Sequence, residues 1–271
     1  MTARLDVALV ERGLARSRRH AQRLIGDGRV CIGPEVVRRP ATLVADDQRL
    51  RVIADPLGPD YVSRAAYKLA GALDTWGGPH VAGRDCMDVG AATGGFTDVL
   101  LRRGARHVVA VDVGHSQLDP DLRADPRVEL REGLNARDLA PGDIDPAPTL
   151  VVVDVSFISL RLVLGPAVSA AAPHADLVVL VKPQFEVGRE ALGAGGVVHE
   201  PSERRRAVAD ILTAAEALGL AAHRLVTSSL PGPAGNLEYV LWLTRGPGEV
   251  QGRPHEDLLV EVFDGPTAGA R

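Results

Sequence analysis

The spacing of apolar residues predicts a small N-terminal domain. Residues 4–26, RLDVALVERGLARSRRHAQRLIG, read as two amphipathic helices, the first ended by Gly13 and the second capped by Ser17. The strand-like segments RVCIG and RLRVI follow, and ADPLGPD is typical of a linker. We therefore expect an α+β domain over residues 1–54 and a linker over 55–62. The expected buried residues are Leu5, Ala8, Leu9, Ala21, Leu24 and Ile25.

From residue 63 onward, apolar strands alternate with helices. The helix SRAAYKLAGALDTWG comes first, followed by the strand-like runs DCMDVG, HVVAVDVG, RVELREG, LVVVDVS and ADLVVLVKP. Nearly continuous apolar strands between helices predict an α/β fold, a doubly wound, mostly parallel sheet of seven strands covered on both faces. The last two runs, HRLVTSSL and NLEYVLWLTR, are close enough in sequence to form an antiparallel pair. This domain is expected over residues 63–247, with a C-terminal tail over 248–271. The helix SERRRAVADILTAAEALG is expected to be capped by Ser202 and to bury Val208, Ile211, Leu212, Ala215 and Leu218.

Composition argues against membrane and metal classes. No apolar run approaches the ~18 to 20 residues of a membrane span, and the N-terminus carries charges where a signal peptide needs an apolar core. Cys31 and Cys86 are too few for a disulfide framework, and the eight histidines have no paired metal-ligand spacing. We expect a cytoplasmic protein without a catalytic metal and without stable membrane association.

Charge is distributed unevenly along the chain. Residues 1–39 hold nine arginines against Asp6, Glu11, Asp27 and Glu35, although the whole chain has a net charge of −4. A basic head on an acidic body is expected to meet a polyanion. The alternative is that the basic face of the second helix is a solvated polar surface that binds no polyanion. The residues expected to contact the phosphates of such a polyanion are Arg4, Arg18, Arg19 and Arg23, the last three on one face of the second helix with Gln22.

The segment MDVGAATGGF joins the end of a strand to the start of a helix. Its glycines let the backbone approach a ligand closely, and Asp112 at the next strand end can accept both hydroxyls of a ribose. The dinucleotide spacing is absent, which favours S-adenosylmethionine over NAD. A tight turn beside a solvated aspartate is the alternative. The expected cofactor-binding residues are Asp88, Gly90, Ala91, Thr93, Gly94, Gly95, Phe96, Asp112 and Asp154.

The chain has two lysines, Lys68 and Lys182, although it uses arginine at 29 positions. A lysine, unlike an arginine, shifts its pKa readily and can exchange a proton. Lys182 ends an apolar strand, as Asp154 does, and Glu238 lies near the start of the final strand. If that strand is antiparallel, all three lie at one edge of the sheet, where Lys68 can join them. The alternative is a structural group of ion pairs.

The four residues Lys68, Asp154, Lys182 and Glu238 resemble the Lys-Asp-Lys-Glu tetrad of FtsJ-like ribose 2′-O-methyltransferases. The N-terminal region is similar to the small RNA-binding domain of ribosomal small-subunit protein four. Together with SRAAYKLAGAL, VKPQFEVGR and PGPAGNLEYVLWL, these features resemble the TlyA family, also called haemolysin A-like. The resemblance implies S-adenosylmethionine-dependent cytidine 2′-O-methylation in ribosomal RNA of one or both subunits. It also implies that Asn135, in LNARDL, lies near the adenine.

The mechanism expected from these residues centres on Lys182, which accepts a proton from the 2′-hydroxyl or orients it. Lys68 is expected to disfavour the charged form of Lys182, while Glu238 and Asp154 fix its geometry. The segment EVGREALGAGGVVHEP either closes on RNA or is a mobile surface loop. Two other function classes remain open at this point: a non-catalytic RNA-binding or ribosome-assembly factor, and a membrane-lytic protein.

Overall fold

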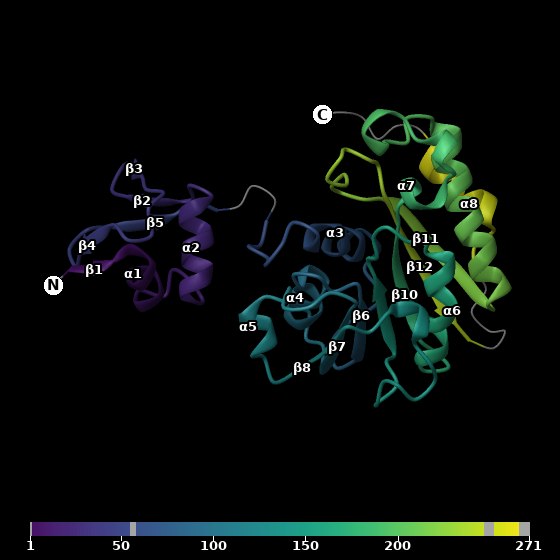
Figure 1. Ribbon diagram of the computed structural model, residues 1–271, viewed down its shortest axis with the longest axis horizontal. Helices are drawn as coiled ribbons and strands as arrows, with labels where there is room; N and C mark the ends of the chain where they lie inside the picture. The colour runs from purple at the N-terminus through teal and green to yellow at the C-terminus, as the bar shows by residue number, and fades with distance from the viewer. Residues whose placement is uncertain (1, 55–57, 247–251, 266–271) are drawn as a thin grey trace. The chain divides into compact units, whose positions relative to one another are not determined.

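The computed structural model describes residues 2–54, 58–246 and 252–265, which form two compact units, Met1–Asp60 and Tyr61–Arg271 (Figure 1). Each unit is treated by itself below. Parts of the predicted ranges lie outside the described residues: residue 1 of the first domain, residues 55–57 of the linker, residue 247 of the second domain, and residues 248–251 and 266–271 of the tail.

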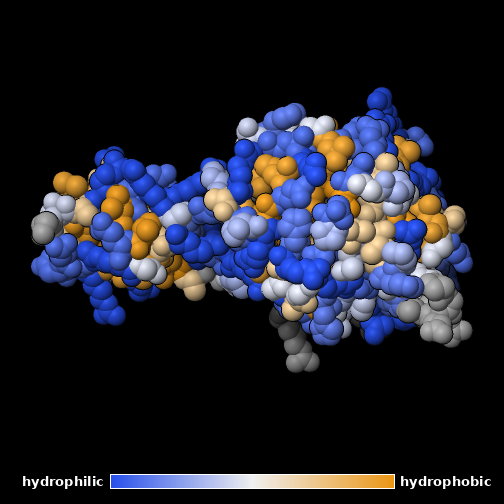
Figure 2. All heavy atoms as spheres, turned by 90° about the horizontal axis from the view of Figure 1, so that it is seen from below, coloured by the Kyte–Doolittle hydropathy of each residue, from blue (hydrophilic) through white to orange (hydrophobic). Residues whose placement is uncertain are grey.

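The N-terminal unit packs two helices against short strands. Ser17 caps the second helix, as expected, by accepting a hydrogen bond from the backbone N–H of His20. The apolar residues predicted to be buried are so, with Leu5 and Ile25 fully inaccessible. Hydrophilic residues dominate the visible surface of this unit (Figure 2). Its elements are β1 (Thr2–Arg4), α1 (Leu5–Glu11), α2 (Arg18–Gly26), β2 (Val30–Ile32), β3 (Glu35–Val36), β4 (Leu43–Ala45) and β5 (Leu50–Val52).

The sheet of the C-terminal unit has, within the described residues, seven strands in the order β11-β12-β10-β9-β6-β7-β8. Strands β10, β9, β6, β7 and β8 are mutually parallel, whereas β12 is antiparallel to both of its neighbours. The predicted mostly parallel sheet and its antiparallel last pair are confirmed. The strands are β6 (Asp85–Val89), β7 (His107–Asp112), β8 (Val128–Glu132), β9 (Leu150–Val153), β10 (Asp176–Val181), β11 (Leu220–Thr227) and β12 (Tyr239–Arg245).

Helices cover both faces of this sheet. Successive strand residues point to opposite faces, so one set of apolar side chains packs with α3 (Ala66–Trp76) and α4 (Gly95–Arg102). The other set packs with α6 (Arg161–Ala170) and α8 (Pro201–Ala217). The remaining helical segments are α5 (Pro120–Arg123), η1 (Ala136–Asp138), α7 (Pro183–Glu186), η2 (Arg189–Ala191), η3 (Ala194–Gly196), α9 (His255–Leu259) and η4 (Val260–Asp264).

Helix α8 differs from its prediction at both ends. Glu200 occupies the N-cap position and Pro201 the first turn, so Ser202 lies inside the helix and does not cap it. Proline is pre-organised for the first helical position because its φ is fixed near the helical value. At the other end Leu218 follows the last helical residue and is 41% exposed, which corrects its expected burial.

The strand register brings charged residues to one edge of the sheet. Val181 of β10 pairs with Tyr239 of β12, which places Lys182 opposite Glu238 at the next position. Asp154 directly follows β9, the parallel neighbour of β10. Because β12 runs antiparallel, its first residues lie at the carboxyl edge of the parallel strands, where ligands bind in open α/β sheets.

Candidate active site

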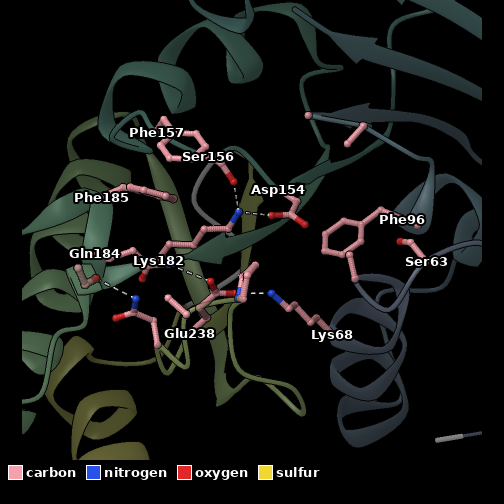
Figure 3. Close-up of a pocket in the computed structure, with 18 of the residues that line it drawn as sticks. Ser63, Lys68, Phe96, Asp154, Ser156, Phe157, Lys182, Gln184, Phe185 and Glu238 are labelled. Atoms are coloured by element: carbon pink, nitrogen blue, oxygen red, sulfur yellow. Dashed lines mark hydrogen bonds and ion pairs between the residues drawn. The ribbon is translucent and has the colours of Figure 1, made fainter. Parts of the chain in front are cut away.

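Four charged side chains meet at this edge, as the sequence predicted. Lys68 comes from α3, Asp154 and Lys182 follow β9 and β10, and Glu238 precedes β12 (Figure 3). Both lysines are 8% exposed and Glu238 is 1% exposed. Burying these charges is unfavourable unless they are paired, so their partners determine what the site can do.

The four residues form two ion pairs. Lys68 Nζ lies 2.5 Å from Glu238 Oε2, and Lys182 Nζ lies 2.6 Å from Asp154 Oδ1. Lys182 Nζ also donates a hydrogen bond to Ser156 Oγ at 2.8 Å. The expectation that Glu238 fixes Lys182 is therefore wrong: its carboxylate neutralises Lys68, and Ser156 takes the expected place beside Lys182.

A pocket of about 500 Å³ opens over these pairs. One end of it is lined by Ser63 and Phe96, which lie beside the glycine loop, and the other by Gln184 and Phe185, with Lys182 between them (Figure 3). All four charged residues line this pocket, together with Gly90, Ala91, Thr93 and Gly95 of the predicted cofactor loop. The pocket therefore places the charged groups between the glycine loop and a second lining surface.

A second pocket of about 760 Å³ adjoins the first, with which it shares Gly90, Ala92, Asp154, Ser156 and Phe157. Asp112 and Asn135 line it, as expected for an adenosine site. The carboxylate of Asp112 is held by two backbone N–H groups, those of Ala92 at 2.8 Å and Gly114 at 2.7 Å. Further lone pairs remain on this carboxylate for the hydroxyls of a ribose.

The glycine loop between the pockets requires residues without a side chain. Gly90 has φ +87° and Gly94 φ +92°, both in the left-handed region. A Cβ on Gly90 would also clash with the carbonyl oxygen of Asp154. The loop therefore lets the backbone follow the pocket wall closely, which fits a cofactor that lies along it.

Asp88 lies beneath this loop and lines neither pocket. It is fully buried, and Thr97 Oγ1 donates a hydrogen bond of 2.6 Å to its Oδ2. Burial raises the pKa of Asp88 to about 7; the negative charge of Asp154 acts in the same direction, while the Thr97 hydrogen bond opposes it. Gly94 also lines neither pocket, so the structure places these two predicted cofactor residues behind the pocket wall.

In the N-terminal unit, a buried carboxylate holds two of the predicted RNA-binding arginines. Asp6 is fully buried; it accepts hydrogen bonds from Arg4 at 3.0 and 3.1 Å, from Arg18 at 2.9 Å and from Gln22 at 2.9 Å. The hydrogen bond from Arg4 holds the pKa of Asp6 well below its usual range. The side chains of Arg4 and Arg18 are still 44% and 57% exposed, so their guanidinium groups are fixed at the surface.

A second carboxylate contacts another face of α2. Asp60 forms ion pairs with His20, with Arg29 at 2.9 Å and with Arg23 at 3.4 Å. Burial alone would raise the pKa of Asp60, but His20 and the arginines outweigh it and lower that pKa. Arg19, the fourth predicted RNA-binding residue, also lies on α2.

Several lining residues were missed by sequence reasoning. Ser156 and Phe157 follow Asp154 within three positions, and Gln184 and Phe185 follow Lys182, so proximity to strand ends was the available signal. Asn236 is 3% exposed and bonds Gly196 and Val198 of the glycine-rich segment. Among the described residues, no group of three or more His, Cys, Asp or Glu has the geometry of a metal site.

Family models match most of each unit. The FtsJ-like methyltransferase model matches residues 61–245, and the S4 domain model matches residues 3–50. In the part of the chain that the structure describes, no helix is long and apolar enough to cross a membrane.

Relatives with known names cover most of the chain. It is 53% identical over 241 residues, 89% of each chain, to the Mycobacterium tuberculosis 16S/23S rRNA (cytidine-2′-O)-methyltransferase TlyA. It is 35% identical over 186 residues, 68% of this chain and 71% of the relative, to the Campylobacter jejuni 23S rRNA (cytidine-2′-O)-methyltransferase TlyA. A solved structure from Streptococcus thermophilus that carries a hemolysin name has a TM-score of 0.72 and 33% identity, covering 97% of this chain and 96% of its own.

Proposed function

The chain belongs to the FtsJ-like methyltransferase family, among the TlyA proteins, and we propose that it methylates the ribose 2′-hydroxyl of a cytidine in ribosomal RNA. The methyl donor is S-adenosylmethionine. The observation that carries the proposal is the ion pair between the buried Lys182 and Asp154, which lies where the two pockets meet. The identity of the target base and RNA rests on the relatives, whose names specify cytidine in 16S and 23S rRNA.

The two pockets fit the donor and the acceptor. The pocket with Asp112 and Asn135 suits the adenosine, while the glycine loop suits the connecting part of the cofactor. S-adenosylmethionine supplies, when bound, an electrophilic methyl group on a sulfonium ion. The end of the first pocket beside Gln184 and Phe185 is left for the acceptor nucleotide.

Lys182 is the residue that handles the hydroxyl proton in this proposal. Its Nζ, in the neutral amine form that can take up a proton, would orient the 2′-hydroxyl and accept the hydroxyl proton, so that the oxygen could take the methyl group that S-adenosylmethionine would supply. Asp154 and Ser156 fix the position of Nζ. Holding the two reactants in line supplies much of the rate acceleration.

Lys68 and Glu238 form a second ion pair that lines the same pocket as Lys182. The Glu238 carboxylate compensates the buried charge of Lys68 and accepts a hydrogen bond from Gln184 Nε2 at 3.0 Å. Removing one partner of a buried ion pair typically costs about 3 to 5 kcal/mol, because the other charge is left uncompensated. We therefore assign this pair to shaping the pocket floor, while Lys182 contacts the acceptor.

The N-terminal unit supplies RNA affinity in the proposal. Its S4 domain presents Arg4, Arg18, Arg19 and Arg23, two of them fixed by Asp6. Arginine side chains held at the surface suit phosphate groups, which position an RNA without reading its sequence. A ribosomal RNA substrate also places the action of the protein in the cytoplasm.

The experiment that tests the proposal maps 2′-O-methyl groups. Ribosomal RNA and isolated subunits lacking the modification are incubated with the protein and S-adenosylmethionine, and methylated positions are located by resistance to alkaline cleavage. We expect new marks on cytidine, absent without protein. RNA that is bound but not methylated would instead assign the protein to the non-catalytic RNA-binding class.

A further inference from the structure

Gln184 lies next to the reacting centre with its amide fixed in one orientation. It follows Lys182 by two residues in α7, lines the first pocket, and donates a hydrogen bond from Nε2 to Glu238 Oε1 at 3.0 Å. Glu238 is 1% exposed and its other oxygen is bound by Lys68, so it is an ionised carboxylate that only accepts hydrogen bonds. The amide must therefore direct its NH₂ group to Glu238 and its oxygen away.

The oxygen so directed has no partner of its own. Gln184 Oε1 is buried and makes no hydrogen bond to any described residue. A buried acceptor without a partner is unfavourable, which is why such atoms in native proteins call for an explanation. A ligand that brings a hydrogen-bond donor into the pocket would satisfy it.

The position of Gln184 indicates which ligand supplies the donor. Figure 3 places Gln184 and Phe185 on one side of Lys182, and Ser63 and Phe96, beside the glycine loop, on the other. In the proposed arrangement the cofactor lies along the glycine loop. Gln184 therefore faces the acceptor nucleotide across Lys182.

We propose that Gln184 Oε1 accepts a hydrogen bond from the exocyclic amine of the acceptor cytosine and thereby selects cytidine over uridine. Cytosine carries a donor, N4–H₂, at the position where uracil carries the acceptor O4. With uracil, the acceptor O4 would face the acceptor Oε1 of Gln184. The amide cannot rotate to present its NH₂ group instead, because that group donates to Glu238. The inference rests on the proposed function, since it concerns the base attached to the methylated ribose.

The test compares RNAs that differ in one functional group at the mapped target position. Three transcripts carry cytidine, uridine or the ribonucleoside of 2-pyrimidinone, which has neither the amine nor the O4. Single-turnover methylation rates are measured for the wild-type protein and for Gln184→Met, which keeps the side-chain length without its amide. With wild type we expect the rate to fall about 10- to 100-fold from cytidine to 2-pyrimidinone, and further with uridine.

Gln184→Met should methylate cytidine RNA as slowly as wild type methylates 2-pyrimidinone RNA. The variant should methylate 2-pyrimidinone RNA no more slowly than it methylates cytidine RNA. Two results would overturn the inference: equal wild-type rates on cytidine and 2-pyrimidinone RNA, or a variant that slows all three RNAs by one common factor. The latter would leave Gln184 as a residue that merely positions Glu238. Wild type inactive on cytidine RNA would instead overturn the proposed function, and this inference with it. Cofactor affinity measured by calorimetry serves as the folding control.

Discussion

The two lysines of the chain, which can exchange a proton as arginine cannot, both lie in the active site. The chain has 29 arginines, and its two lysines are both buried and form ion pairs at the carboxyl edge of the sheet. Their convergence could be predicted because strand ends of a parallel sheet share an edge. Their pairing could not, since which carboxylate faces which ammonium depends on side-chain direction. Ser156 was missed because a serine in a loop has no periodic pattern, and its position close to a strand end was the available signal.

Ser156 is expected to act through Lys182. Ser156→Ala removes the hydroxyl that accepts from Lys182 Nζ, leaving the Asp154 carboxylate and the more distant Phe185 ring as its partners among the described residues. We expect kcat to fall about 10-fold with little change in KM, because a looser Nζ affects the transition state more than substrate binding. Steady-state kinetics measure kcat and KM separately. Ser156→Thr retains the hydroxyl and should recover most of the rate; if it is as slow as alanine, the hydroxyl is not responsible.

Asp88 is expected to make stability depend on pH. Its folded pKa, raised to about 7 by burial, lies above the ordinary value of 3.8, so its stabilising contribution is complete below pH ~4 and is lost as pH rises through 7. Asp88→Asn keeps the shape without the charge. The free energy of unfolding of the variant, relative to wild type, should therefore rise between pH 5 and 8, by about 2 to 3 kcal/mol. Urea denaturation at the two pH values measures it; a difference independent of pH contradicts the raised pKa.

Individual elements were largely predictable from periodicity. The helical spacing of apolar residues placed α1, α2 and α3, and the apolar strand runs placed β6, β7, β9 and β10. The short segments α7, α9 and η4 were not predicted, since four or five residues give too little periodicity. In α9, Leu258 and Leu259 are nevertheless buried against the core. The arginine pattern of α2 could be seen in the sequence, but the pairing of Arg18 with Asp6 of α1 could not be predicted from it.

Asp6 is expected to strengthen RNA binding although it carries a negative charge. Simple electrostatics predicts that Asp6→Asn, which makes the domain more basic, binds RNA more tightly. The structure predicts the reverse, because Arg4 and Arg18 lose the carboxylate that orients them. We expect affinity for ribosomal RNA to fall about 3- to 10-fold, measured by filter binding at fixed salt. Tighter binding by a folded Asp6→Asn protein contradicts the orienting role, and Gln22→Leu provides a variant that loses a bond to Asp6 without any change in charge.

The whole molecule separates RNA binding from chemistry. The S4 domain match lies within the unit Met1–Asp60 and the methyltransferase match within Tyr61–Arg271, so each task has its own core. The excess of arginine over acidic residues in residues 1–39 predicted from the sequence that polyanion binding belongs to the N-terminal unit. How the two units meet on an RNA was not predictable, since no periodicity or motif reports on it.

Replacing Arg18, Arg19 and Arg23 together by glutamine tests this division of tasks. Losing up to three phosphate contacts should lower the slope of log affinity against log salt by about 2 to 3 and weaken RNA binding at low salt. The affinity for S-adenosylmethionine, measured by calorimetry, should stay within about twofold. An unchanged salt slope would remove these arginines from the RNA-binding surface.

The central claim is that Lys182 transfers the hydroxyl proton, and Lys182→Arg tests it most directly. Arginine keeps the positive charge and can pair with Asp154, but it does not deprotonate in proteins. In a single-turnover assay with saturating S-adenosylmethionine and ribosomal RNA, we expect the methylation rate to fall at least about 100-fold, while RNA and cofactor affinities stay close to wild type. A variant that methylates cytidine at nearly the wild-type rate would contradict the account.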